Sequence, residues 1–363
     1  MWRKKQKEPP INKLPLILIT LLSLSGCGTS AITPKAQSPD YPDAWQREGD
    51  TGEAKQDWLK DFPDTQVKTL IGEALNQNFA LASQAAAVDV AAQNKRIARS
   101  ARLPRLDLSL RNSRDQSNPF DGVSFETRSV FSITADLSFE IDLWRRLSDA
   151  ERAAHLNLLS IEADYEDARR VLAANTARQW YNSIEAKQLL GLFQERLANL
   201  SESADIIENG YRQGINEALD VFLAQNSVEQ EEANVDSQQQ LLLENIAQLQ
   251  RFLARYPDGN MEVSKTLPVI DSTIPVGLPA ELITRRADVQ SAWLSLLSAD
   301  AELAVSHKAR FPSLALSGRA SDTTEEFDDL LQDGVSAWSI VWNLSRPLFD
   351  GGRLASLEEQ AKA

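Results

Sequence analysis

The chain has 363 residues, 25% of them charged, and a formal net charge of −14. This acidic balance, without a basic patch interleaved with aromatic residues, argues against a nucleic-acid-binding protein. The single cysteine, Cys27, excludes an intrachain disulfide. The only histidines, His155 and His307, supply too few ligands for a histidine-based metal site or triad, and we interpret both as ordinary helix-surface residues.

Residues 1–26 are typical of a secretory signal. A basic stretch is followed by an apolar run at 14–24, which is shorter than the roughly twenty residues of a membrane-spanning helix, and then by small residues. The run ends in Leu24-Ser25-Gly26-Cys27, which resembles the bacterial lipobox and implies a diacylglycerol on Cys27; the alternative is a plain signal peptide with an incidental cysteine. We interpret residues 27–61, rich in Pro, Asp, Gln and Gly, as a lipidated tether.

Two helices and a strand hairpin follow. Asp64 or Thr65 is suited to cap the first helix, and the second is expected over 81–102, before Pro104. From Phe131 to Leu143, every odd position is apolar and every even position is polar or charged. At roughly 3.3 Å per residue this strand exceeds 40 Å, so it suits a membrane-spanning strand, or else a long edge strand in a soluble sandwich. Together with 105–111 it predicts a hairpin over 105–143.

A long helical hairpin is predicted over 145–255. Apolar residues recur in a heptad pattern, no proline interrupts 145–209, and about 65 residues at 1.5 Å each give a helix near 100 Å long. A turn at 210–214 and a cap at Asn216 then lead into a second helix over 217–255. With the preceding elements, these helices make residues 62–257 a first repeat.

Residues 258–363 repeat the plan incompletely. A helix over about 280–309 precedes a second strand hairpin over about 312–346, with an acidic loop at 321–333. Gly352-Arg353-Leu354 then stands where Arg145-Arg146-Leu147 stood about 207 residues earlier, at the start of another helix. The duplication predicts that both halves are one supersecondary unit.

By these features the chain resembles the TolC-type outer-membrane factors, in particular the lipoprotein (NodT) branch that serves RND efflux pumps. Besides the lipobox, the resemblance is carried by three motifs: residues 210–214 (GYRQG) with LDV at 219–221, residues 277–282 (GLPAEL) leading to RRADV at 285–289, and residues 346–354 (RPLFDGGRL). Ala287 stands where the family usually has proline, which affects only a helix start.

The resemblance implies a mixed α+β membrane protein. Each chain would give four strands to a trimeric, twelve-stranded barrel in the outer membrane, with long helices forming a periplasmic tunnel. The helical turn would contact a periplasmic adaptor bound to an inner-membrane pump, through Arg212, Gln213, Gly214, Ile215, Asn216 and Glu217. By alternation along the strand, three carboxylates would line the lumen and bias it toward cations: Asp136, Glu140 and Asp142.

The family has a second long helical hairpin, whereas this sequence ends at Ala363. We therefore expect that roughly ninety to a hundred residues of the family's plan are absent, and that this chain alone does not close a tunnel. Stable, conducting trimers of the 363-residue chain would contradict that expectation.

The function that the sequence favours is a passive duct in a tripartite efflux system, with no cofactor and no enzymatic activity. The alternatives are a duct for type I protein secretion and a non-pore periplasmic lipoprotein scaffold. The scaffold leaves two amphipathic hairpins unexplained. An enzyme is disfavoured because no phosphate loop, nucleophile elbow or metal-ligand spacing appears, and adjacent carboxylates such as Glu231-Glu232 are usually solvated.

Overall fold

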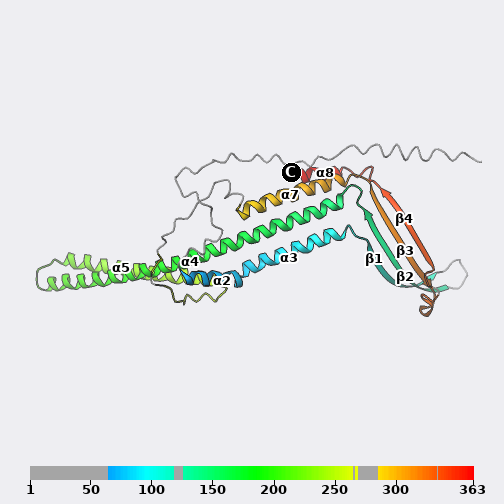
Figure 1. The fold of residues 1–363 in the computed structure, drawn as a ribbon. Coiled ribbons are helices and arrows are strands. Elements are labelled where there is room, and N and C mark those ends of the chain that lie inside the picture. The colour runs from blue at the N-terminus through cyan, green and yellow to red at the C-terminus, as the bar shows by residue number, and fades with distance from the viewer. Residues whose placement is uncertain (1–63, 118–125, 265, 269–284, 333) are drawn as a thin grey trace, which may run out of the picture. The chain divides into compact units, whose positions relative to one another are not determined.

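The computed structural model describes residues 64–117, 126–264, 266–268, 285–332 and 334–363 (Figure 1). All of these residues belong to one compact unit. The predicted signal at 1–26, Cys27 and the tether at 27–61 lie outside the described residues.

Two capped helices open the described part. Helix α2 (Thr65–Gln77) begins where the Asp64 carboxylate accepts hydrogen bonds from the backbone N–H groups of Gln66 and Val67. Helix α3 (Phe79–Ser100) is capped by Asn78, whose side chain accepts from the Leu81 N–H. Both caps satisfy donors that the first helical turn leaves free.

Four antiparallel strands form one sheet in the order β1-β2-β3-β4: β1 Arg105–Ser117, β2 Glu126–Ile141, β3 Ser313–Thr324 and β4 Ala337–Ser345. The hairpins of the two repeats therefore lie side by side, joined by the β2–β3 pairing. Strand β1 continues to Ser117, and β3 runs four residues into the segment that the sequence suggested as an acidic loop. Within the described chain, β1 and β4 are the outer strands, and each has one unpaired edge.

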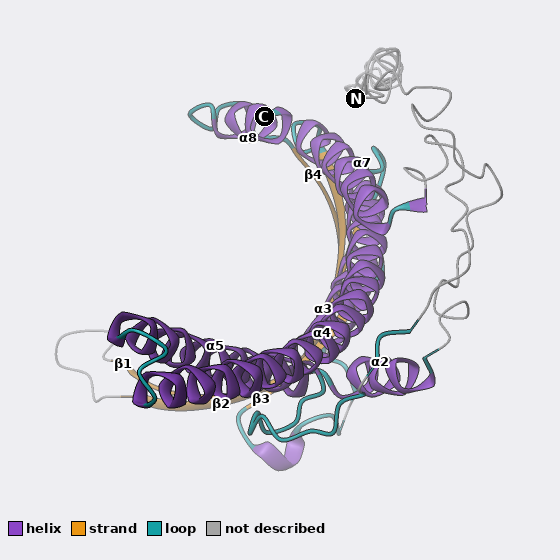
Figure 2. Cartoon of the chain, turned by 90° about the vertical axis from the view of Figure 1, so that its left-hand side faces the viewer, coloured by secondary structure: helices purple, strands orange, loops and turns teal. Residues whose placement is uncertain are grey.

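The long helix α4 (Arg146–Arg212) has 67 residues, and it turns into α5 (Ala218–Phe252). Near the sheet α4 lies between α3 and α7 (Ala287–Lys308), whereas its far half packs against α5 (Figure 1). A short helix α8 (Arg353–Lys362) packs on α7. Seen along the helices, the sheet is a curved band that follows the row of helices (Figure 2).

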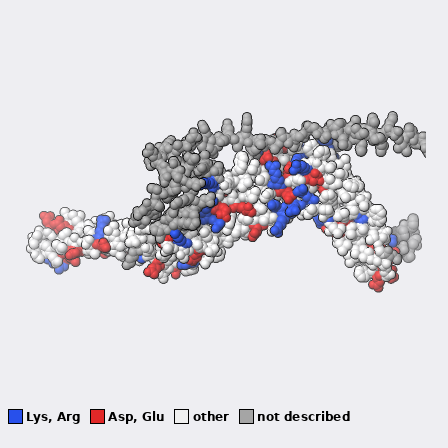
Figure 3. All heavy atoms as spheres, in the orientation of Figure 1, with Lys and Arg blue, Asp and Glu red and all other residues white. Residues whose placement is uncertain are grey.

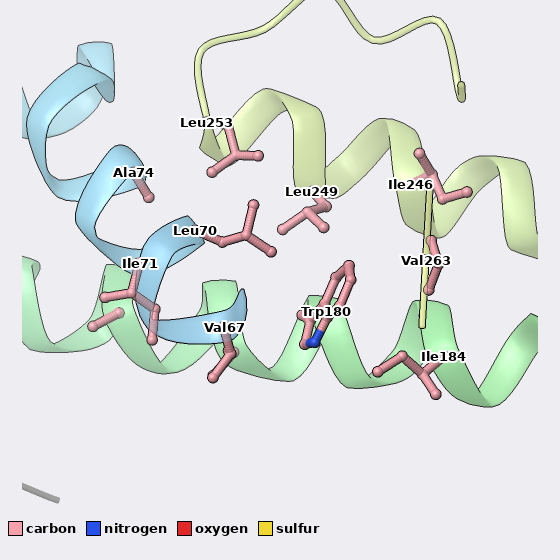
Figure 4. Packing of buried hydrophobic residues seen from close by; sticks show 12 residues of the cluster. Val67, Leu70, Ile71, Ala74, Trp180, Ile184, Ile246, Leu249, Leu253 and Val263 are labelled. Carbon is pink, nitrogen blue, oxygen red and sulfur yellow. The ribbon is translucent and has the colours of Figure 1, made fainter. Parts of the chain in front are cut away.

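A buried apolar core lies where α2, α4 and α5 meet (Figure 4). Trp180 is 0% exposed there, and its indole Nε1 donates to Asp64 Oδ2 at 2.9 Å. Asp64 thus caps α2 and also ties it to α4. The remaining members come from the three helices and from the segment after α5: Val67, Leu70, Ile71, Ala74, Ala173, Ala177, Ile184, Ile246, Leu249, Leu253 and Val263.

The duplication extends to the backbone at the strand-to-helix junctions. Arg145, the N-cap of α4, has φ 63°, and Gly352, the N-cap of α8, has φ 86°. Both residues thus adopt the left-handed conformation, which costs a non-glycine residue roughly 1–2 kcal/mol. The two repeats share one turn, but only the second places glycine in it.

We therefore expect Arg145→Gly to stabilise the protein by about 1 kcal/mol, because glycine removes the left-handed strain without altering the turn. Urea unfolding in detergent, followed by far-UV circular dichroism, measures this change. Arg152→Gly is the matched control, since it places glycine inside the same helix and should destabilise by about 1 kcal/mol. A lower unfolding midpoint for Arg145→Gly would show that the guanidinium, and not the strain, dominates at this position.

Candidate functional site

One face of the sheet is apolar across all four strands. The register aligns Leu108 with Ala135, Ala135 with Ala320, and Ala320 with Trp338. Neighbouring rows continue the face, with these exposed members: Leu106, Leu108, Leu110, Leu137, Trp338, Ile340, Trp342 and Leu344. Isolated exposed apolar residues are common, but a contiguous apolar face of this kind marks an interaction surface.

The opposite face of the sheet is polar, and its charges are largely paired. Asp136, a predicted lumen residue, accepts a 2.7 Å bond from Arg319 on β3. Glu140 pairs at 2.7 Å with Arg146, at the start of α4. Both carboxylates lie on this face, as the alternation predicts, but each already has a cation beside it. They are therefore not the row of free negative charge that a cation bias requires.

Asp142, the third predicted lumen residue, is not part of the strand, because β2 ends at Ile141. Its carboxylate caps α4, accepting from the backbone N–H groups of Leu147 and Ser148 and from the Ser148 hydroxyl. Burial alone would raise the pKa of Asp142, but these hydrogen bonds hold it below its ordinary value. The expectation that Asp142 lines the lumen by alternation was wrong, since the chain turns into a helix at this residue.

The predicted tip residues form the turn between α4 and α5, but they play different parts in it. Gly214 has φ 75°, which requires glycine or costs strain. Asn216 does not cap α5 as expected, because its side chain reaches back and donates to the Ile207 carbonyl at 3.0 Å. A Cβ on Gly210 would stand only 2.6 Å from the Asn216 Nδ2 atom, so this closure needs glycine at 210. Glu217 is the N-cap, and its N–H donates to Asp220.

The side chains that the tip presents to solvent are mainly apolar. Ile215 is 74% exposed, and four further apolar residues near the turn are more than half exposed: Ile206, Leu219, Phe222 and Leu223. The last three follow Ile215 at helical spacings of four, seven and eight residues, so they share one face of α5. These residues were not predicted from the sequence, because the turn alone was interpreted as the contact site. Their apolar side chains recur at helical spacing outside the heptad positions, and that spacing was the signal that could have identified them.

Arg212 and Gln213 complete the predicted tip. Arg212 is exposed and pairs with Glu208 one turn earlier. Gln213 is exposed in the turn itself. Of the six predicted residues, Gly214 and Asn216 therefore shape the turn, whereas Arg212, Gln213 and Ile215 are exposed to solvent.

Two interpretations of titratable residues were wrong. Glu231 is only 2% exposed, at a seam position of α5, where its carboxylate lies 3.5 Å from the Arg196 Nε and accepts from Asn234. His307 contacts Glu358 of α8, so it is not an ordinary surface residue. Arg310 and then His307 lower the pKa of Glu358 to about 2.

Among the described residues, no group of His, Cys, Asp and Glu could hold a metal ion. In the same part of the chain, no helix combines the length and the apolar character needed to cross a membrane.

These features define a class of protein: a membrane-associated antiparallel sheet with one apolar and one polar face, continued by a helical hairpin far longer than globular proteins use. Residues 70–255 and 278–363 match the outer membrane efflux protein family, so the chain belongs to that family. Its fold is the TolC-like fold of outer-membrane efflux channels, and it is an outer-membrane efflux channel protein with a periplasmic helical domain.

Relatives agree with this assignment. The probable efflux pump outer membrane protein SepC of Pseudomonas putida is 28% identical over 354 residues, which cover 92% of this chain and 72% of SepC. The cation efflux system protein CusC of Escherichia coli (strain K12) is 27% identical, covering 95% of this chain and 76% of CusC. A crystal structure of CusC superimposes with a TM-score of 0.74 at 25% identity, covering 89% and 76% of the two chains. The outer-membrane channel OprN shows the same fold, with a TM-score of 0.78 at 22% identity over 92% of this chain and 76% of OprN.

Proposed function

We propose that three of these sheets join edge to edge as a twelve-stranded barrel, with the apolar face toward lipid and the polar face toward a water-filled lumen. The observation that carries this proposal is the sheet itself, which is apolar on one face across four strands and unpaired at both outer edges. Backbone groups at an open edge have no partners in lipid, so a membrane sheet must close on itself. An even number of strands per chain allows β4 to meet β1 of the next copy antiparallel.

Alternating cysteine labelling tests this orientation. In a Cys27→Ser background, Leu108→Cys on the apolar face and Ser109→Cys on the polar face are neighbours on β1, so each is the control for the other. In reconstituted vesicles, we expect a membrane-impermeant maleimide to modify the cysteine at 109 at least tenfold faster than the one at 108. Equal labelling rates at both positions would show that both faces of the strand are exposed to water, which would contradict the proposed barrel.

The duct would carry substrates handed over by a periplasmic adaptor and an inner-membrane RND pump, which supplies the transport energy. Support comes from the exposed apolar tip of the α4–α5 hairpin, which is a surface suited to a protein partner. Asp136 and Glu140 would face the lumen as ion pairs, so the lumen charge would be balanced at their level.

The passive role follows from the same architecture. A duct has no reaction to catalyse, and we assign it neither a cofactor nor an enzymatic activity. The efflux role is favoured over protein secretion because the relatives SepC and CusC are efflux components.

Cys27 would carry the lipid anchor that its lipobox implies, holding the mature chain in the periplasmic leaflet. Two or more acyl chains anchor firmly where a single chain binds only marginally. The mass of the N-terminal peptide of the purified protein tests this assignment, and an unmodified Cys27 or an intact residue 1–26 segment would contradict it.

A further inference from the structure

On α3 and α4, four exposed arginines near the sheet have no carboxylate partner among the described residues: Arg96 and Arg99 near the end of α3, and Arg145 and Arg152 at the start of α4. We refer to them as the junction arginines. Several other cations at the same level are already neutralised, in the pairs Arg102–Glu151, Arg146–Glu140, Lys308–Asp149 and Arg310–Glu358. In a chain with a net charge of −14, this group of uncompensated cations makes the local charge positive.

Lys and Arg side chains gather near the sheet-side ends of the helices (Figure 3). Arg145 is the N-cap of α4 and Arg152 lies about two turns into that helix, whereas Arg146 pairs with Glu140 on the polar side. In the view of Figure 3, the strands themselves carry few charges. Positive charge therefore borders the sheet where the strands end.

Aromatic side chains lie at the same border. Trp144 is exposed directly before Arg145, and its indole Nε1 donates to the Pro312 carbonyl at 2.7 Å, which fixes it next to β3. Phe349, in the segment between β4 and α8, is 92% exposed. Exposed aromatic rings beside cations at the edge of an apolar sheet are typical of a membrane–water interface.

We propose that the junction arginines bind the phosphate groups of anionic phospholipids in the periplasmic leaflet, an inference that rests on the membrane-inserted sheet proposed above. Arg99 lies in the last turn of α3, which ends at Ser100, and residues 101–104 then lead into β1. The long arginine side chain can extend from there toward the headgroup layer, which is roughly 5–8 Å thick on one side of a bilayer. Guanidinium groups suit this role because they bind phosphate oxygens in a bidentate geometry.

Spin-labelled lipids test the proposal on the full chain reconstituted in phosphatidylcholine. The immobilised fractions of labelled phosphatidylglycerol and phosphatidylcholine give their relative association with the protein surface. We expect a preference for phosphatidylglycerol that falls by about fivefold for each arginine removed, and that weakens at high salt. Arg99→Gln/Arg152→Gln should therefore abolish most of it.

The matched control is Arg178→Gln/Arg251→Gln, which removes the same charge from exposed, unpaired positions on α4 and α5. Arg178 lies about 48 Å along α4 from its start, beyond reach of the headgroups. This control should keep the preference. Two results would overturn the lipid site: equal association of both lipids with the unaltered protein, or an unchanged preference in Arg99→Gln/Arg152→Gln. In either case, immobilised phosphatidylcholine would still show that the sheet is inserted in the membrane. Without any immobilised lipid, the membrane insertion on which the site depends would itself be wrong.

Discussion

Trp180→Ala should lower the free energy of unfolding by about 3–5 kcal/mol, the largest stability effect that we expect from a single substitution in this chain. Trp180 is completely buried between α2, α4 and α5, so its removal leaves a cavity at the point where the three helices meet. It also removes the donor to Asp64, the residue that caps α2. Urea unfolding in detergent, followed by far-UV circular dichroism, measures the loss.

Two further variants separate packing from hydrogen bonding. Trp180→Phe keeps most of the apolar volume but leaves Asp64 Oδ2 without its donor, so a smaller loss of about 1–3 kcal/mol is expected. Trp338→Ala, on the exposed face of β4, removes the same side chain without opening a cavity and should change stability by about 0.5 kcal/mol or less. If Trp180→Ala and Trp338→Ala unfolded at the same urea concentration, the core would not be what holds the three helices together.

Charge at the hairpin tip should abolish contact with the adaptor. Ile215→Glu and Phe222→Glu each replace an exposed apolar side chain by a carboxylate, whose burial at an interface costs far more than the roughly 1.5–3 kcal/mol that the apolar side chain contributes. We expect at least a hundredfold loss of affinity. A photo-crosslinking amino acid at the exposed position of Gln213 reports the contact in cells that contain the adaptor.

The control is Leu192→Glu, which makes the same kind of change at an exposed apolar residue of α4, twenty residues and about 30 Å before the end of that helix. Crosslinking should survive there. Substitution of Gly214 is a poorer test, because its φ of 75° means that any side chain strains the turn. If Ile215→Glu and Phe222→Glu crosslinked as well as Leu192→Glu, the adaptor would bind elsewhere on the hairpin.

Local pattern was enough to locate most elements. Alternation over Phe131–Leu143 predicted both the strand and its two unlike faces, and heptad spacing without proline predicted a helix from 145 to 209, close to the observed Arg146–Arg212. Both signals are strong because the periods 2 and 3.5 persist over many residues. Element ends were less accurate: Asp142 was placed in the strand, yet its carboxylate caps the following helix, a role that depends on the turn and not on the period.

The sequence by itself determined the order of the elements, the faces of the strands, the internal duplication and the family. Only the tertiary structure decided which charges are free. Asp136 and Arg319 are 183 residues apart in the chain and meet only because β2 and β3 pair in one register. Glu231 looked like a solvated residue beside Glu232, and it is buried because the opposing face of α4 covers it. Periodicity describes one element at a time, whereas the charge of a lumen or a junction depends on which elements become neighbours.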